Sequence, residues 1–237
     1  MPQKVAEAQF FQEPIRQGGV YAAVYVSREN FGAVLSPAGH LRPRVYRTAL
    51  RNPGAYARNL LNFQIRRMPY KKFVVIRDLR DTLVSDYFGI KISHPLVSER
   101  ISKYRTILKN LTTDQGLIYL MDEVTSRYAE IQASWMNDDA LIIKYEDLVA
   151  DEHGTFEQIV NYCEIDVDRK YLHQIVSNNS FEVVTGRKRG EEDVQAHQRK
   201  GIVGDWRNYF SGQVKEEFKK RFGDVLIKTG YERDLHW

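Results

Sequence analysis

The apolar run KFVVI at 72–76, followed at once by the charged string RDLRD, is the feature that most constrains the fold. A continuous run of this length is typical of a strand buried on both faces, as in a parallel sheet covered by helices. From Thr82 the string TLVSDYFGI has helical spacing. The segment therefore predicts a strand, a basic loop and a helix, which is half of a βαβ unit.

A second apolar run, ALIIKY at 140–145, has the same character, and EDLVAD begins the next turn and helix. Spacing and capping residues, such as Thr-Thr-Asp from Thr112, indicate the other elements of this part of the chain. These are helices at about 95–111, 113–136, 154–163 and 167–177, a Gly- and Arg-rich loop at 185–204, and a last helix from Gly212. Alternating strands and helices predict an α/β fold with a mostly parallel sheet flanked by helices.

The first quarter of the chain has a less regular pattern. Residues 19–36 contain two short runs rich in Val, Tyr and Phe around Ser-Arg-Glu-Asn, which predicts a β-hairpin or two short strands. RVYRT at 44–48 predicts another strand, and 53–67 a helix with Pro53 near its start. Because no repeat or Pro/Gly/Ser-rich linker is present, we expect a single domain over 1–237.

Composition excludes several classes of protein. With 43% hydrophobic residues, a 237-residue chain can bury roughly 70 to 75% of its unfolded surface, which excludes disorder as the main state. No apolar stretch reaches the ~18 to 20 residues of a membrane span, and MPQKVAEAQFFQEP lacks the apolar core of a signal peptide. We therefore expect a soluble, cytoplasmic protein. The single cysteine, Cys163, excludes an internal disulfide and a zinc site built on several thiolates.

The net charge is small, but the charged residues are unevenly distributed along the chain. The chain has 35 Lys and Arg against 31 Asp and Glu, a formal net charge of +4. Basic residues cluster at 42–51, 66–72, 77–80, 187–189 and 199–207. Several clusters lie near predicted strand ends and form no continuous basic face, which argues against nucleic acid as a partner. Ligands of open α/β sheets bind beyond the carboxyl ends of the strands, where loop amides are available to anions.

Arg77 lies at the carboxyl end of the first buried strand, and Ser85 follows eight residues later within the helix. An arginine fork with a nearby hydroxyl can clamp a phosphate. The alternative is that Arg77 pairs with Asp78 or Asp81 while Ser85 only packs.

A second candidate is the string RKGIVGDWRNYFS at 199–211. Arg199 and Lys200 precede Gly201, which would let the backbone approach a ligand closely. A basic pair, a glycine and a helix start make an anion-binding loop plausible, although basic loops with glycine are common.

Four ordered segments resemble the sulfotransferases that use 3′-phosphoadenosine 5′-phosphosulfate (PAPS). FVVIRDLRDTLVSDYF resembles the family's strand, loop and helix that bind the 3′-phosphate, with Arg77 and Ser85 in the contact positions. LIIKYEDL resembles the segment whose tyrosine, here Tyr145, contacts the adenine side of the nucleotide.

The other two segments lie towards the C-terminus. SNNSFEVV resembles the segment whose aromatic ring, here Phe181, packs on the adenine. GRKRGEED leading into HQRKGIVGDWRNYFS resembles the C-terminal signature in which Arg199, Lys200 and Gly201 hold the 3′-phosphate. Four segments in order are strong evidence for the fold, whereas one alone would be weak.

The resemblance implies a P-loop-kinase-like sulfotransferase fold. It further implies an enzyme that transfers a sulfuryl group from PAPS to a hydroxyl or amine of a small-molecule acceptor and releases the product PAP. Arginine and lysine charges would take the place of the Mg²⁺ of a kinase, so no metal is implied. Loops at 19–42 and 88–104 are candidates for the acceptor pocket, while Tyr87, Phe88 and Trp206 are expected in the core.

The sequence departs from the family in its N-terminal part. The loop of the type Pro-Lys/Arg-Ser-Gly-Thr-Thr, which grips the 5′-phosphosulfate, is not found, and SPAGHLRPR at 36–44 matches it only loosely. The Lys-Thr-His segment that supplies a base in many members corresponds to Arg47-Thr48-Ala49. Either the chain starts downstream of the family's first strand, or this half has been rebuilt or lost. In the second case His40 is the nearest candidate base, although a lone histidine is more often structural.

Two other functions compete with the transferase. A non-catalytic or truncated relative that binds PAP or PAPS is favoured by the missing loop and by Ala49. A kinase-like protein that uses ATP is disfavoured, because the sequence has no Gly-x-x-x-x-Gly-Lys-Ser/Thr motif.

Overall fold

A computed structural model describes residues 26–29, 31, 69–96 and 98–237. The chain divides into two compact units by its internal contacts. One comprises Met1–Lys72 with Asn137–Asp139, and the other comprises Phe73–Met136 with Ala140–Trp237. The second unit contains every candidate site residue from Arg77 onwards.

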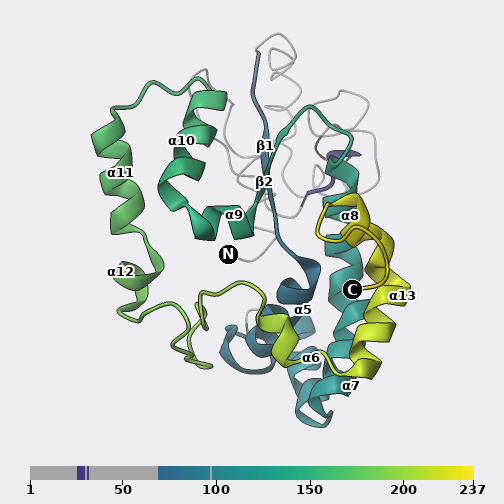
Figure 1. The fold of residues 1–237 in the computed structure, drawn as a ribbon. Coiled ribbons are helices and arrows are strands. Elements are labelled where there is room, and N and C mark those ends of the chain that lie inside the picture. The colour runs from purple at the N-terminus through teal and green to yellow at the C-terminus, as the bar shows by residue number, and fades with distance from the viewer. Residues whose placement is uncertain (1–25, 30, 32–68, 97) are drawn as a thin grey trace, which may run out of the picture. The chain divides into compact units, whose positions relative to one another are not determined.

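The two apolar runs pair as a parallel sheet of β1 (Phe73–Ile76) and β2 (Leu141–Lys144), which confirms the predicted α/β arrangement (Figure 1). Ile76 pairs with Lys144, so the two strands end at the same edge. Burial of β1 is one-sided: Ile76 is 2% exposed, but Val75 is 47% exposed. The prediction of a strand buried on both faces is therefore wrong for β1, because successive side chains point to opposite faces and only one is covered.

Helix α5 (Leu79–Phe88) begins three residues before the predicted start at Thr82. Asp78 caps it by accepting a hydrogen bond from the backbone N–H of Arg80. A side-chain acceptor at this position satisfies a donor that the first helical turn leaves free. The connection between β1 and α5 is thus only Arg77 and Asp78, and RDLRD is not a loop as expected.

The remaining elements follow the predicted order (Figure 1). Thr112 and Gln115 form a capping box, as the Thr-Thr-Asp string predicted for this helix start. The single helix expected at 113–136 is interrupted by a π-helical stretch. The elements are η3 (Gly89–Ser93), α6 (Glu99–Lys109), α7 (Thr113–Leu120), η4 (Met121–Thr125), α8 (Ser126–Trp135), α9 (Tyr145–Ala150), α10 (Glu152–Tyr162), α11 (Arg169–Asn178), α12 (Phe181–Thr185), η5 (Asp205–Asn208) and α13 (Gly212–Lys228).

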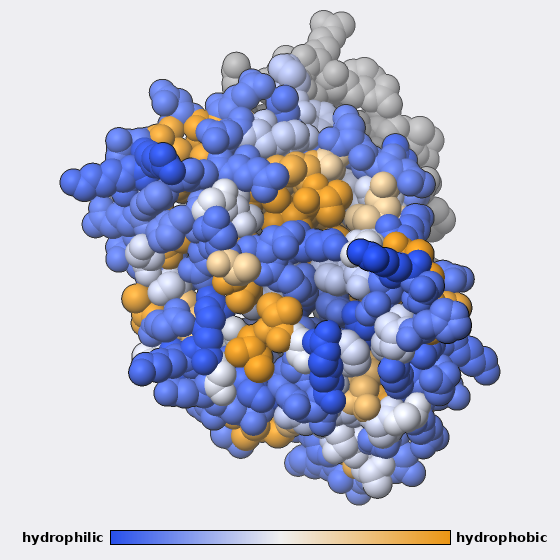
Figure 2. Space-filling model, viewed as in Figure 1, coloured by the Kyte–Doolittle hydropathy of each residue, from blue (hydrophilic) through white to orange (hydrophobic). Residues whose placement is uncertain are grey.

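The main core of this unit lies where α5, α7, η4 and α13 meet. Leu83, Leu117, Met121 and Phe218 have no exposed surface. Tyr87 is also buried, as predicted. Burial of this kind contributes roughly 1.5 to 3 kcal/mol for each large side chain. It fixes α5, the helix that carries Ser85. On the face shown in Figure 2, apolar residues form separate groups within a mainly hydrophilic surface.

The described part of the smaller unit is short. Arg28, Glu29 and Phe31 are helical, and the Phe31 N–H donates to the Ser27 carbonyl at 2.8 Å. Arg28 and Glu29 are therefore helical, where the sequence predicted the turn of a hairpin. The rest of the predicted hairpin, the strand at 44–48, the helix at 53–67 and His40 lie outside the described residues. Among the helices that are described, none is long and apolar enough to cross a membrane.

Candidate functional site

Arg77 stacks on Tyr145 at the shared carboxyl edge of the two strands. The Arg77 Cζ lies 4.7 Å from the centre of the Tyr145 ring. Arg77 directly follows β1 and Tyr145 directly follows β2, so the parallel register brings them together. Arg77 Nε is buried and has no hydrogen-bond partner among the described residues. A buried guanidinium N–H without an acceptor is unusual and leaves a donor available to an anion.

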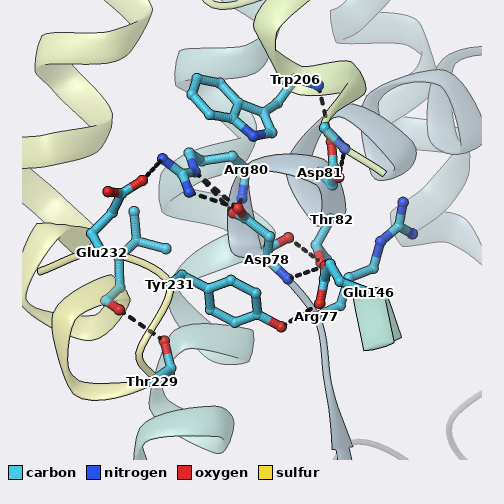
Figure 3. Close-up of polar contacts among 12 residues, drawn as sticks. Arg77, Asp78, Arg80, Asp81, Thr82, Glu146, Trp206, Thr229, Tyr231 and Glu232 are labelled. Atoms are coloured by element: carbon cyan, nitrogen blue, oxygen red, sulfur yellow. Dashed lines mark hydrogen bonds and ion pairs between the residues drawn. The ribbon is translucent and has the colours of Figure 1, made fainter. Parts of the chain in front are cut away.

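Asp78 pairs with Arg80 and not with Arg77. Its carboxylate accepts hydrogen bonds from Arg80 Nε at 3.0 Å and Nη2 at 2.7 Å. Arg80 is only 3% exposed, lies 4.1 Å from the Trp206 ring centre, and donates from Nη1 to Glu232 at 2.5 Å (Figure 3). The carboxylate of Asp78 is thus occupied by Arg80 and does not neutralise the charge of Arg77.

Asp81 connects α5 to the loop that precedes η5. Its carboxylate accepts hydrogen bonds from the backbone N–H groups of Gly204 at 2.6 Å and Trp206 at 2.9 Å. Burial raises the pKa of Asp81, and the two N–H groups and the charge of Arg77 act in the opposite direction. No ion pair joins Arg77 to Asp81 within the part of the chain that is described. The sequence alternative of an Arg77 pair with Asp78 or Asp81 is therefore wrong.

Arg199 and Lys200 share the carboxylate of Asp205. Lys200 Nζ lies 2.8 Å from Asp205 Oδ1, while the Arg199 guanidinium pairs with Asp205 Oδ2 and with Glu192. Burial acts to raise the pKa of Asp205, but the hydrogen bonds from Lys200 and Arg199 outweigh it, so the pKa falls. Both cations are held in place, yet part of their charge is already balanced.

Arg199 also reaches the helix that carries Ser85. Its Cζ lies 4.3 Å from the centre of the Phe88 ring, three residues after Ser85 on α5. Residues three apart on a helix lie on the same face. Ser85 is exposed, so its hydroxyl is accessible to a ligand.

Gly201 lies against Phe181 in a left-handed backbone conformation, with φ of +63°. A Cβ at Gly201 would approach the Phe181 ring to 2.6 Å, so glycine is required by both conformation and space. Arg189 Nη1 donates to the Gly201 carbonyl at 2.9 Å. These contacts bring Phe181 to the Arg199–Lys200–Gly201 loop, as expected if they share a ligand.

Helix α5 is the element that connects these groups. Arg77 lies just before its first turn, Ser85 and Phe88 lie in its last turns, and Asp81 holds the loop after Gly201. The proposed base His40 is not among the described residues. Within the described ranges, no group of three or more His, Cys, Asp and Glu could hold a metal ion.

Sequence reasoning missed Asp86, the neighbour of Ser85 on α5. Its Oδ2 is buried without a hydrogen-bond partner among the described residues. Burial raises the pKa of Asp86 to about 7, although the charge of Arg77 acts to lower it. A signal was present in the sequence, since Asp86 is an acid between the apolar residues Val84 and Tyr87 in a segment of helical spacing.

Arg77 stacks on Tyr145 at the carboxyl edge of a parallel sheet, and Asp81 of α5 holds the loop that follows a second basic pair. This arrangement defines an α/β protein suited to an anionic, ring-containing ligand. The sequence pattern of the sulfotransferase domain family matches residues 57–230, so the chain belongs to the sulfotransferase family. This confirms the predicted family.

Individual relatives support the assignment at modest identity. The chain is 25% identical over 180 residues to 3-alpha-hydroxysteroid sulfotransferase of Cavia porcellus, covering 70% of this chain and 58% of that protein. It is 29% identical over 173 residues to sulfotransferase 2A1 of Homo sapiens, covering 66% of this chain and 56% of that protein. The chain thus spans little more than half the length of these relatives.

The structure of mouse sulfotransferase SULT7A1 complexed with PAP matches with a TM-score of 0.50 and 20% identity. The match covers 70% of this chain and 64% of that chain. It confirms the predicted sulfotransferase fold.

Proposed function

We propose that this protein is a sulfotransferase that uses PAPS to transfer a sulfuryl group to a hydroxyl or amine of a small-molecule acceptor, releasing PAP. The observation that carries the proposal is Arg77, whose buried Nε has no partner among the described residues while its guanidinium lies on Tyr145. Membership of the sulfotransferase family supports it. No metal is needed in this proposal, because fixed arginine and lysine charges stabilise the phosphate groups.

In this proposal Arg77 and Ser85 bind the 3′-phosphate from the strand end and from α5. Arg199 and Lys200 add charge from the opposite loop, and Gly201 lets its backbone approach the phosphate closely. Arg199 would exchange its contact with Glu192, whose side chain is 34% exposed, for the ligand. Asp205, which is buried, would keep both cations in position.

The two aromatic residues would hold the adenine. Tyr145 is partly buried beneath the Arg77 guanidinium, and Phe181 is partly exposed beside Gly201. An aromatic ring offers a purine a large apolar contact at a small entropic cost. The phosphate clamp and the rings together would fix the nucleotide in one orientation.

PAPS itself supplies the activated sulfuryl group. Transfer of such a group depends mainly on positioning and on charge stabilisation, as in phosphoryl transfer. The described residues would contribute orientation by anchoring the 3′-phosphate end. His40 remains our proposal for the base that removes the acceptor proton.

A second candidate function is the binding of PAP or PAPS without catalysis. It is supported by Ala49 in the position of the family's histidine and by the lack of a recognisable 5′-phosphosulfate loop. A transfer assay with radiolabelled PAPS and a panel of phenols, steroids and amines separates the two. Labelled product supports the enzyme, whereas PAP binding without any transfer supports the second function.

The first experiment is isothermal titration of the full chain with PAP and with adenosine 5′-monophosphate, which lacks only the 3′-phosphate. We expect PAP to bind in the micromolar range or tighter, and the monophosphate at least tenfold more weakly. Equal affinity for both nucleotides, or binding of neither by the folded chain, would rule out the 3′-phosphate site.

A further inference from the structure

Two buried polar atoms at the site have no partner among the described residues: Arg77 Nε and Asp86 Oδ2. They belong to groups of opposite charge, and the charge of Arg77 acts on the Asp86 carboxyl. Asp86 follows Ser85 directly on α5. A third such atom, Gln132 Oε1, belongs to a side chain whose Nε2 donates to the Arg77 carbonyl at 3.0 Å. Three buried polar atoms without a described partner thus belong to Arg77, to a side chain bonded to its carbonyl, and to the acid on which its charge acts.

Burying a carboxyl oxygen without a hydrogen bond costs free energy, so the position of Asp86 Oδ2 requires an explanation. Burial raises the pKa of Asp86 to about 7, and the opposing effect of Arg77 does not cancel it. Near neutral pH the carboxyl is therefore present in both protonation states. A small change in the charge nearby is enough to shift it to one of them.

We propose that Asp86 takes up a proton when a phosphate group binds at Arg77, so that nucleotide binding is coupled to proton uptake. This inference rests on the proposed function and names a residue that tunes the same site. An ionised Asp86 repels the phosphate and competes for the Arg77 guanidinium. The protonated carboxyl removes the repulsion and adds an O–H donor. The bound state therefore favours the protonated form.

Charged groups on the elements packed against α5 have partners of their own. Helix α5 packs against η3, α7, η4 and η5, and it lies close to the start of α9. On α5 itself, Arg80 and Asp81 are bound as described above. The charged groups on the packed elements and their partners are Lys91 with Tyr87, Asp114 with Ser211, Asp122 with Arg221, Glu123 with Tyr104, Glu146 with Tyr231, Asp205 with Arg199 and Lys200, and Arg207 with the Trp206 ring. Arg77 is the group whose charge acts on Asp86.

Coupling to one proton gives a defined pH dependence. Above pH 7 the free protein must first protonate Asp86, so the dissociation constant for PAP rises by up to tenfold per pH unit. The second ionisation of a phosphate monoester lies near pH 6 and is nearly complete at pH 7.5. The interval from pH 7.5 to 8.5 therefore isolates the contribution of Asp86.

The test is titration of the full chain with PAP at pH 7.5 and 8.5, in pairs of buffers with different ionisation enthalpies. We expect the wild-type affinity to fall five- to tenfold and the protein to take up close to one proton at pH 8.5. The PAP affinity of Asp86→Asn, whose side chain has the same shape, should change by less than twofold between the two pH values. This variant should take up no proton on binding. Asp224→Asn, at an exposed aspartate of α13, is the matched control and should behave as the wild type.

The outcomes separate the inference from the proposed function. If PAP binds but wild-type affinity is constant over this interval, or Asp86→Asn keeps the wild-type dependence, the inference is overturned and the 3′-phosphate site stands. If the folded chain binds no PAP at either pH, the proposed function fails first. Asp86→Ser, which is smaller and uncharged, serves as the second variant if Asp86→Asn does not fold, with the same result expected.

Discussion

The guanidinium of Arg77 lies over the ring of Tyr145 at 4.7 Å, although 68 residues separate the two positions. Parallel pairing of β1 and β2 causes this contact, because each residue directly follows one of the strands. The two acids that follow Arg77 in the sequence, Asp78 and Asp81, are bound elsewhere. The site therefore contains one cation whose buried Nε has no partner in the described part of the chain, and a basic pair whose charge is already partly balanced.

This difference predicts unequal effects of removing the two arginines. Arg77→Ala should weaken PAP binding by roughly 1.5 to 3 kcal/mol, or one to two decades, since it removes a charged donor that forms no ion pair with a described residue. Arg199→Ala should weaken PAP binding by less, about 1 kcal/mol, because Asp205 and Glu192 already balance part of the charge of Arg199. Titration calorimetry measures both. Arg169→Ala, at an exposed arginine of α11, is the control and should leave affinity unchanged. An equal or larger loss for Arg199→Ala would contradict this ranking.

Ser85→Ala tests the hydroxyl on α5. We expect a loss of roughly 0.5 to 1.5 kcal/mol in PAP binding, as for one neutral hydrogen bond. Folding should be unaffected, because Ser85 is exposed and alanine favours helix. The measurement is the dissociation constant for PAP together with the melting temperature. A loss greater than that of Arg77→Ala would show that the assumed geometry is wrong.

Gly201→Ala tests the approach of the basic loop to Phe181. The new Cβ would need a left-handed backbone and would lie 2.6 Å from the Phe181 ring, so the loop must move. We expect a destabilisation of about 1 to 2 kcal/mol and weaker PAP binding. Thermal unfolding and titration report the two effects. Gly212→Ala is the matched control, since no atom lies within 4 Å of its new Cβ and its φ is ordinary, and it should change neither value.

Asp86 also predicts a pH dependence of stability. Its pKa rises from an ordinary 3.8 to about 7 on folding, so the native state holds the proton more tightly than the unfolded state. The unfolding free energy should therefore fall as pH rises from about 4 to 7, and the penalty should then stay constant. Asp86→Asn removes this penalty and should raise the unfolding free energy by on the order of 1 to 3 kcal/mol at pH 7.5. Urea unfolding of the wild type and of Asp86→Asn at pH 5 and 7.5 measures this difference. If the variant's gain in unfolding free energy is no larger at pH 7.5 than at pH 5, the prediction is wrong.

Local features of the fold follow from the sequence. The runs at 72–76 and 140–145 pair as parallel strands, as their continuous apolar residues predicted, although β1 is covered on one face only. The helices after Thr112 and Ser211 start where capping side chains stand in the sequence. Arg77 could be placed at the carboxyl edge of the sheet, since its position follows from the end of a strand. The start of α5 was misplaced because the acids of RDLRD resemble a loop, whereas Asp78 is a cap.

Pairing among charged groups was decided by tertiary structure alone. The hydrogen bond between Asp81 and Gly204 spans 123 residues, and no local pattern distinguishes Asp81 from Asp78 as its acceptor. The burial of Asp86 depends on which elements pack around α5. Periodicity along a chain reports a residue's immediate neighbours, while desolvation and ion pairing depend on distances that exist only after distant segments pack together. The sequence by itself determined the strands, the helices and the residues available at the site, and the tertiary structure decided which of their charges remain free.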